Sequence, residues 1–208
     1  MKHRVIFSFF CWILFLNSLI AQENKTGQIE IMVSVPYVNN FYSVPEGESA
    51  KFGTGFWGLS GGLGYQYSPN KFARLTLSSQ IQYEVPVLMG IDYEDGVYEG
   101  QSTANLSLTD NYQLKRWTFG YGLSYSWNSW HISYMGKDYI PPHQVSRQVL
   151  NQSLGLNLTT YFNLFKNLDV GIVYRPQFLT LHPTTKLNYQ HSISLDIALK
   201  FRIKTKKN

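Results

Sequence analysis

The residues most suited to chemistry in this sequence are a histidine and a serine two positions apart. His131 and Ser133 flank Ile132, and Asp138 is the nearest acidic residue downstream. In such an arrangement the imidazole takes the proton of the serine hydroxyl, and a carboxylate orients the imidazole. Residues i and i+2 of a strand point the same way, so any strand brings such a pair to one face. A histidine and a serine at the rim of a strand, without catalytic role, explain the spacing equally.

A second candidate is a group of aromatic, proline and histidine residues in segments of polar composition. The group comprises Tyr37, Phe41, Tyr42, Tyr134, Tyr139, Pro141, Pro142 and His143. Exposed rings of this kind bind sugars or protein partners, and rings that stack on one another within ordered loops give the same composition. Both interpretations stay open at this stage.

The composition excludes several classes of protein. Of 208 residues, 44% are hydrophobic, 16% aromatic and only 15% charged, which predicts one folded domain and excludes a disordered chain. The net charge is +5, and removal of Lys2 and Arg4 with a leader lowers it to +3, so nothing predicts a nucleic-acid partner. A Walker-type phosphate loop (Gly-x-x-x-x-Gly-Lys-Ser/Thr) and His-x-x-x-His are absent, and we expect no metal and no cofactor.

Residues 1–21 have the layout of a cleaved signal peptide. Lys2 to Arg4 form a basic start, an apolar run follows from Val5 to Leu16, and Ala21 is a small residue at the cleavage position. The run is short for a membrane-spanning helix, which is the alternative. The only cysteine, Cys11, lies within this run, so the mature chain, residues 22–208, would contain neither a disulfide nor a thiolate.

The mature chain alternates apolar and polar residues with a period of two, the pattern of half-buried β-strands. The clearest case is 187–203, where nine apolar or aromatic side chains alternate with polar ones. The predicted strands are 29–37, 57–67, 73–83, 98–112, 117–127, 150–162, 168–174 and 187–203.

The connections between these strands alternate in length. Short turns at 68–71, 113–116 and 165–167 alternate with long loops at 39–50, 84–97, 129–146 and 180–186. Short turns at one end and long loops at the other, with an even number of strands, are typical of bacterial outer-membrane barrels. We therefore predict an all-β fold, an eight-stranded antiparallel up-and-down transmembrane β-barrel with short periplasmic turns and long extracellular loops.

The polar phase of the strands indicates which face meets lipid. It consists mostly of Gly, Ser, Thr, Asn and Gln, whereas a water-facing exterior would be rich in charged residues. We therefore expect the apolar phase to face lipid, in contrast to a soluble lipocalin-like carrier with an apolar interior. Two interface girdles of aromatic residues are expected, with Tyr65, Tyr67, Tyr112, Trp117, Phe162 and Phe201 near the short turns and Tyr37, Tyr83, Tyr98, Tyr125, Trp127 and Phe178 near the long loops.

A few ionisable residues interrupt the polar phase. They are Glu30, Arg74, Asp169, Arg175, Asp196 and Lys200. The interior of an eight-stranded barrel is just wide enough for its own side chains, so we expect these charges to pair in a structural network across the lumen. A path for protons or ions is the alternative.

By its strand pattern, the chain resembles the small eight-stranded outer-membrane β-barrel proteins of Gram-negative bacteria, of the OmpA and OmpX type. The resemblance implies an outer-membrane location, contact with outer-membrane lipid, and insertion by the barrel-assembly machinery. It favours a non-enzymatic protein with a structural role or with loops that bind an extracellular ligand. A narrow channel or a transporter of lipophilic molecules is an alternative.

The His131-Ile132-Ser133 segment is similar to the His-x-Ser element of outer-membrane lipid A deacylases. That likeness implies a second alternative, a lipid hydrolase using His131 and Ser133. In those enzymes an Asn follows the Ser and a Glu lies further on, whereas here Tyr134 follows and no Glu occurs after Glu99.

Overall fold

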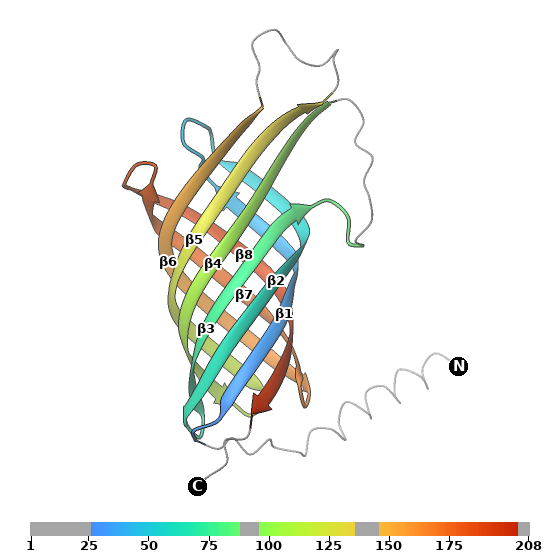
Figure 1. Cartoon of the computed structure of the whole chain (residues 1–208), viewed down its shortest axis with the longest axis vertical. Coiled ribbons are helices and arrows are strands. Elements are labelled where there is room, and N and C mark those ends of the chain that lie inside the picture. The colour runs from blue at the N-terminus through green and yellow to red at the C-terminus, as the bar shows by residue number, and fades with distance from the viewer. Residues whose placement is uncertain (1–25, 88–95, 136–145, 204–208) are drawn as a thin grey trace, which may run out of the picture.

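A computed structural model describes residues 26–87, 96–135 and 146–203 as a closed barrel of eight antiparallel strands (Figure 1). The strands are β1 (Ile29–Ser43), β2 (Lys51–Ser68), β3 (Lys71–Tyr83), β4 (Gly96–Leu114), β5 (Trp117–Met135), β6 (Arg147–Phe165), β7 (Leu168–His182) and β8 (Lys186–Ile203). Each strand pairs with its neighbours in sequence, and β1 pairs with β8 to close the ring. The predicted fold is confirmed. The predicted signal peptide lies outside the described residues.

The two ends of the barrel differ. Pro69-Asn70, Lys115-Arg116 and Lys166-Asn167 form two-residue turns at the end where β1 begins and β8 ends, which we call the turn end (Figure 1). Lys115 has a φ of 53°, the left-handed conformation that tight hairpins favour. The opposite end, with the longer connections, is the loop end. Within the described residues, no helix is long and apolar enough to cross a membrane.

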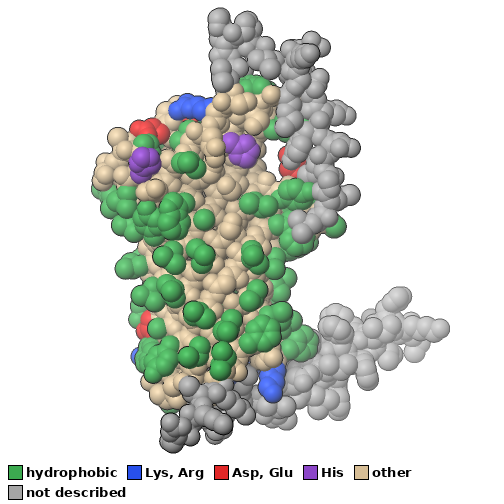
Figure 2. All heavy atoms as spheres, in the orientation of Figure 1, with side chains coloured by type: hydrophobic (Ala, Val, Ile, Leu, Met, Phe, Trp, Pro, Cys, Tyr) green, Lys and Arg blue, Asp and Glu red, His purple; other side chains and the backbone are tan. Residues whose placement is uncertain are grey.

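The apolar phase of the strands faces outward. In β8, Leu195 is 41% exposed while its neighbour Ser194 is fully buried in the lumen. Hydrophobic side chains are spread over the outer surface along the barrel (Figure 2). The predicted outward orientation of the apolar phase is therefore confirmed, and the polar interior contradicts the lipocalin-like alternative, which needs an apolar one.

The interior is filled by polar side chains, most of them Ser, Thr, Asn and Gln. Glycines on the inner face make room for larger partners on the neighbouring strands. A Cβ on Gly171 would lie only 2.4 Å from the Tyr161 ring, which occupies that space. The lumen of the described barrel is thus a close-packed polar core.

The strands extend further toward the loop end than the sequence predicts. Strand β1 continues to Ser43, β5 to Met135 and β7 to His182, so parts of the predicted loops 39–50, 129–146 and 180–186 are strand. Strands β4, β5 and β6 have 19 residues each, where about 9 to 11 suffice to cross a membrane. These three strands rise above the rest of the rim as a wall (Figure 1).

Candidate functional site

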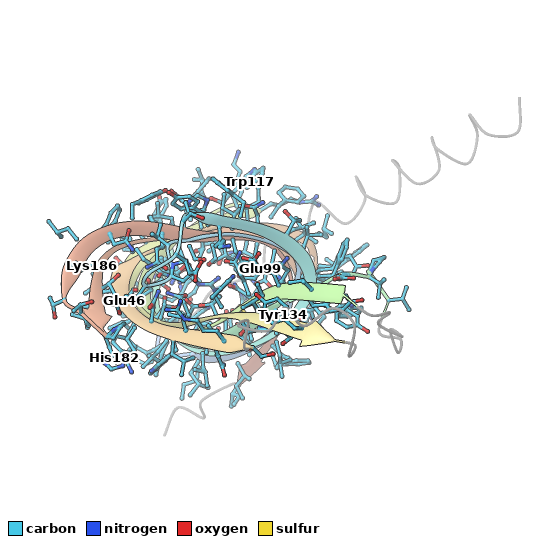
Figure 3. All side chains as sticks on the ribbon, turned by 90° about the horizontal axis from the view of Figure 1, so that it is seen from above. Glu46, Glu99, Trp117, Tyr134, His182 and Lys186 are labelled. Carbon is cyan, nitrogen blue, oxygen red and sulfur yellow. The ribbon has the colours of Figure 1, made fainter. Side chains whose placement is uncertain are left out.

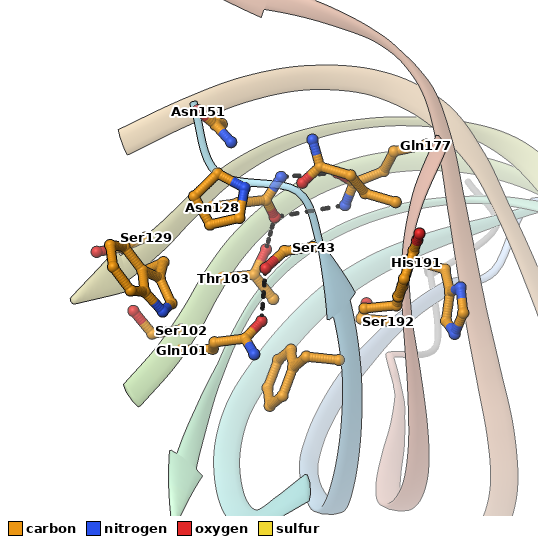
Figure 4. Close-up of a pocket in the computed structure, with 15 residues that line it drawn as sticks. Ser43, Gln101, Ser102, Thr103, Asn128, Ser129, Asn151, Gln177, His191 and Ser192 are labelled. Atoms are coloured by element: carbon orange, nitrogen blue, oxygen red, sulfur yellow. Dashed lines mark hydrogen bonds between the residues drawn. The ribbon is translucent and has the colours of Figure 1, made fainter. Parts of the chain in front are cut away.

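The lumen contains a polar cavity just below its mouth at the loop end (Figure 4). The residues lining this loop-end chamber come from β1, β4, β5, β6, β7, β8 and the β1–β2 connection. They include Phe41, Ser43, Pro45, Gln101, Thr103, Asn128, Trp130, Asn151, Gln177, Gln190 and Ser192. No Asp, Glu, Lys or Arg is among the described residues that line the chamber.

Amide and hydroxyl side chains bridge the chamber from wall to wall. The Thr103 hydroxyl donates to Asn128 Oδ1 at 2.8 Å, and Asn128 Nδ2 donates to Gln177 Oε1 at 2.7 Å. The Ser43 hydroxyl donates to Gln101 Oε1 at 2.8 Å. Figure 4 shows these bonds crossing between strands. They leave room for only about one or two water-sized particles in the chamber.

Two aromatic rings close the chamber on its sides. Phe41 and Trp130 are 4% and 3% exposed. Of the two interpretations left open for the aromatic group, the exposed surface does not hold for Phe41, which lies in β1. A bulge between Pro36 and Val38 shifts the phase of β1 and turns Phe41 inward. Tyr42 faces outward instead and stacks on His191, with ring centroids 5.5 Å apart.

An ionic cluster lies above the chamber at the rim. Glu99 accepts a hydrogen bond from the indole of Trp130. It also forms an ion pair with Lys51, whose Nζ lies 3.1 Å from Glu99 Oε1. The Lys51 ammonium also lies 5.1 Å from the centroid of the Trp130 ring. The cluster therefore joins β2, β4 and β5 at the mouth.

The connection between β1 and β2, residues 44–50, is bound to the opposite side of the mouth. Arg147 of β6 donates to Glu48 Oε1 at 2.9 Å and to the Glu46 carbonyl at 3.0 Å. The Thr184 hydroxyl donates to Glu46 Oε1 at 2.6 Å. Figure 3, seen from above, places Glu46 and Glu99 over the ring of strands. We call this connection the cap, and Pro45 within it is fully buried.

His131 and Ser133 lie on the outer face of β5, away from the chamber. His131 is exposed, and its ring covers the backbone of Gly100, where a Cβ would lie 2.4 Å from His131 Cε1. No hydrogen bond joins the two side chains within the described residues. Asp138 lies outside those residues, as do Tyr139, Pro141, Pro142 and His143.

The six lumenal charges lie in the turn-end half of the barrel and form several contacts. Arg74 donates to Glu30 Oε1 at 2.7 Å, and Lys200 forms an ion pair with Asp169. Asp196 accepts a hydrogen bond from the Tyr161 hydroxyl.

Arg175 is 3% exposed and forms no ion pair within 4 Å among the described residues. The sequence interpretation missed Arg202, which lies 3.3 Å from Glu30 Oε2, and Tyr161. Arg202 has an even number, like the other inward residues of β8, and Tyr161 an odd number, like those of β6. This alternation is the signal that would have found them. No group of three or more potential metal ligands occurs in the described part of the chain.

No family model and no curated protein matches this sequence. Solved structures do match the barrel. Ail, the attachment invasion locus protein of Yersinia pestis, aligns with a TM-score of 0.56 and 12% identity, over 85% of this chain and all of Ail. The fold is that of the small outer-membrane β-barrels. Neisserial surface protein A aligns with a TM-score of 0.50 and 12% identity, over 83% of this chain and 97% of that protein.

A second structure of Ail, in complex with the heparin analogue sucrose octasulfate, aligns with a TM-score of 0.54 and 10% identity. It covers 85% of this chain and all of that one. At such low identity the likeness concerns the backbone fold.

Proposed function

We propose that this chain is an integral outer-membrane protein whose barrel is an anchor and whose loop end binds an external partner. A signal peptide of residues 1–21 would direct export, and the apolar outer face would contact outer-membrane lipid after insertion by the barrel-assembly machinery. The observation that carries the proposal is the packing of the lumen, because a filled barrel leaves the loop end as the surface available for recognition.

The packing supports an anchor over a narrow channel or a conduit for lipophilic molecules. At the loop end, the bonds between Thr103, Asn128 and Gln177 cross the chamber beneath the cap. In the turn-end half, Tyr161 and Arg175 are buried in the middle of the lumen. A conducting path would require the hydrogen-bonded side chains at the loop end and the Tyr161 and Arg175 side chains in the turn-end half to move.

The binding surface we propose consists of the cap and the wall of β4, β5 and β6. The heparin analogue bound to Ail raises the question whether a polyanion is the partner here too. At this rim, Lys51 pairs with Glu99 and Arg147 pairs with Glu48, so these two cations are already neutralised. This pairing favours a partner recognised by hydrogen bonds and shape over a polyanion.

Cell fractionation combined with gel electrophoresis tests the anchor. We expect the protein to pellet with the outer membrane, to need detergent for extraction and to migrate faster before boiling than after, because closed barrels resist detergent. Recovery as a soluble monomer without detergent would contradict the proposal.

Binding to whole cells tests the role of the loop end. Arg147→Ala releases the cap from β6, and we expect it to weaken adhesion of expressing cells to host-surface extracts. Lys166→Ala, in a turn at the opposite end, is the matched control and should leave adhesion unchanged. Equal adhesion by both variants and by cells without the protein would refute loop-end binding. If added heparin inhibits the adhesion, the partner is a polyanion and the proposed partner class is wrong.

A further inference from the structure

The turn-end half of the lumen contains a second cavity, enclosed by two buried arginines. Its lining includes Arg74, Asn157, Thr159, Tyr161 and Arg175. Arg74 and Arg175 are 4% and 3% exposed. The cavity has room for about one small particle.

The two guanidinium groups have hydrogen-bond donors that no protein group accepts. Arg74 Nε, Arg175 Nε and Arg175 Nη1 lack a partner among the described residues, as does the Thr159 hydroxyl. Buried donors of this kind are rarely left unsatisfied. Asn157 Oδ1, an acceptor on the same lining, also lacks a partner within the described chain, so unpartnered donors outnumber unpartnered acceptors around the cavity. A particle in the cavity therefore has to accept several hydrogen bonds at once.

The charge balance around the cavity is positive. Arg74, Arg175, Lys200 and Arg202 face three carboxylates in this half of the lumen, those of Glu30, Asp169 and Asp196. Glu30 and Asp169 are engaged by Arg74, Arg202 and Lys200, whereas Arg175 has no carboxylate of the described residues within 4 Å. Asp196 accepts from Tyr161 and does not line the cavity. Arg175 is thus a buried cation without a counter-charge in contact.

We propose that this cavity binds one small monovalent anion of the halide class, held by Arg74 and Arg175. A halide accepts hydrogen bonds from several donors and neutralises the excess charge. A water molecule accepts only two and must donate its own two protons, and it leaves the charge of Arg175 uncompensated. The anion would act as a structural counter-ion for the barrel.

Thermal unfolding of the refolded protein in detergent micelles, followed by heat-dependent gel migration, tests the proposal. Sodium chloride is compared with sodium gluconate at equal ionic strength, because gluconate is too large for the cavity. A ligand that binds only the folded state lowers the unfolding constant about tenfold for each tenfold rise in its concentration above Kd. We expect this dependence for chloride and not for gluconate.

Arg175→Met should abolish the chloride dependence, and Arg147→Gln at the rim is the matched control that should keep it. Equal stabilisation by chloride and gluconate, or a chloride dependence that survives Arg175→Met, would overturn the proposal. If Arg175→Met does not fold, anomalous diffraction from wild-type crystals grown in sodium bromide decides. A bromide peak between Arg74 and Arg175 is expected, and water alone at that position would overturn the anion site.

Discussion

The two halves of the lumen are both largely closed to solvent but are built from different chemistry. The turn-end half contains the charged residues Glu30, Arg74, Asp169, Arg175, Asp196, Lys200 and Arg202, whereas the loop-end half contains mainly amides such as Asn128, Asn151, Gln177 and Gln190. An ionised carboxylate only accepts hydrogen bonds and a guanidinium or ammonium group only donates them, while an amide does both. The charged half is therefore tied to one arrangement of strands, and the neutral half can exchange partners beneath the proposed binding surface.

The largest effect that follows from this difference is the loss of a buried counter-charge. Lys200→Met leaves the Asp169 carboxylate unpaired in the lumen, and we expect it to lower the free energy of unfolding by about 3 to 5 kcal/mol. Gln190→Met in the neutral half removes only a 3.4 Å hydrogen bond to Thr180 and should cost about 1 kcal/mol. Urea titrations in lipid bilayers measure both.

A double variant provides the control for that comparison. Asp169→Leu together with Lys200→Met removes both charges and should recover most of the lost stability, because the penalty comes from the charge left alone. Equal losses for Lys200→Met and Gln190→Met would show that the two halves do not differ in this way.

The sequence predicts the barrel well because the membrane imposes its pattern on each strand. A strand that faces lipid on one side and a packed lumen on the other needs strict alternation, and 187–203 shows it along nearly all of β8. The strand ends were predicted poorly for the same reason. Above the membrane the outer face no longer has to be apolar, so Asn40, His131 and Gln148 stand at strand positions where alternation fades.

The lumenal contacts could be predicted only in part. Alternation assigns Arg74, Asp196 and Lys200 to the interior, but which charges meet depends on the register of distant strands. Arg74 contacts Glu30 across β2, at a sequence separation of 44 residues. The loop-end chamber was missed altogether, because neutral amides give no signal in a single sequence and because the bulge at Pro36/Val38 reverses the inward phase of β1.

An arginine on the outer face tests whether the loss of stability caused by a charge depends on the face of the barrel that carries it. Leu195→Arg places a guanidinium on the lipid face near the middle of β8, and we expect it to destabilise the barrel in bilayers by about 2 to 4 kcal/mol. Ser194→Arg, on the inner face, should overpack the space around Gln80, whose Nε2 lies 2.9 Å from Ser194 Oγ, and should also bury a guanidinium without a counter-charge. We expect it to cost at least about 3 to 5 kcal/mol. Normal folding of Leu195→Arg, with the new side chain open to water-soluble reagents, would contradict the assigned faces.

The ion pair at the rim should matter much less than the pair in the lumen. Glu99→Gln removes the charge that faces Lys51 but keeps an acceptor for the Trp130 indole, and the Glu99 side chain is 40% exposed. Exposed pairs are screened by solvent, so we expect a loss of about 0.2 to 1 kcal/mol in the same urea titrations. A loss as large as that of Lys200→Met would mean that the rim cluster is as dependent on charge pairing as the turn-end half.

The smallest expected effect concerns the outer face of β5, where the catalytic alternative is located. His131 and Ser133 point outward, on the face opposite to Trp130 and the chamber, and His131 covers Gly100 without a hydrogen bond to Ser133. Catalysis would require the serine hydroxyl and the imidazole within about 2.6 to 3.2 Å and an acid on the far ring nitrogen. We therefore expect His131→Ala and Ser133→Ala to change stability by no more than about 0.5 kcal/mol and to leave barrel assembly intact. The acylation pattern of lipid A, measured by mass spectrometry of cells with each variant, should match that of the wild type. A difference in acyl chains that depends on the protein and disappears in both variants would establish the hydrolase, because no structural role of an exposed histidine and serine alters lipid A.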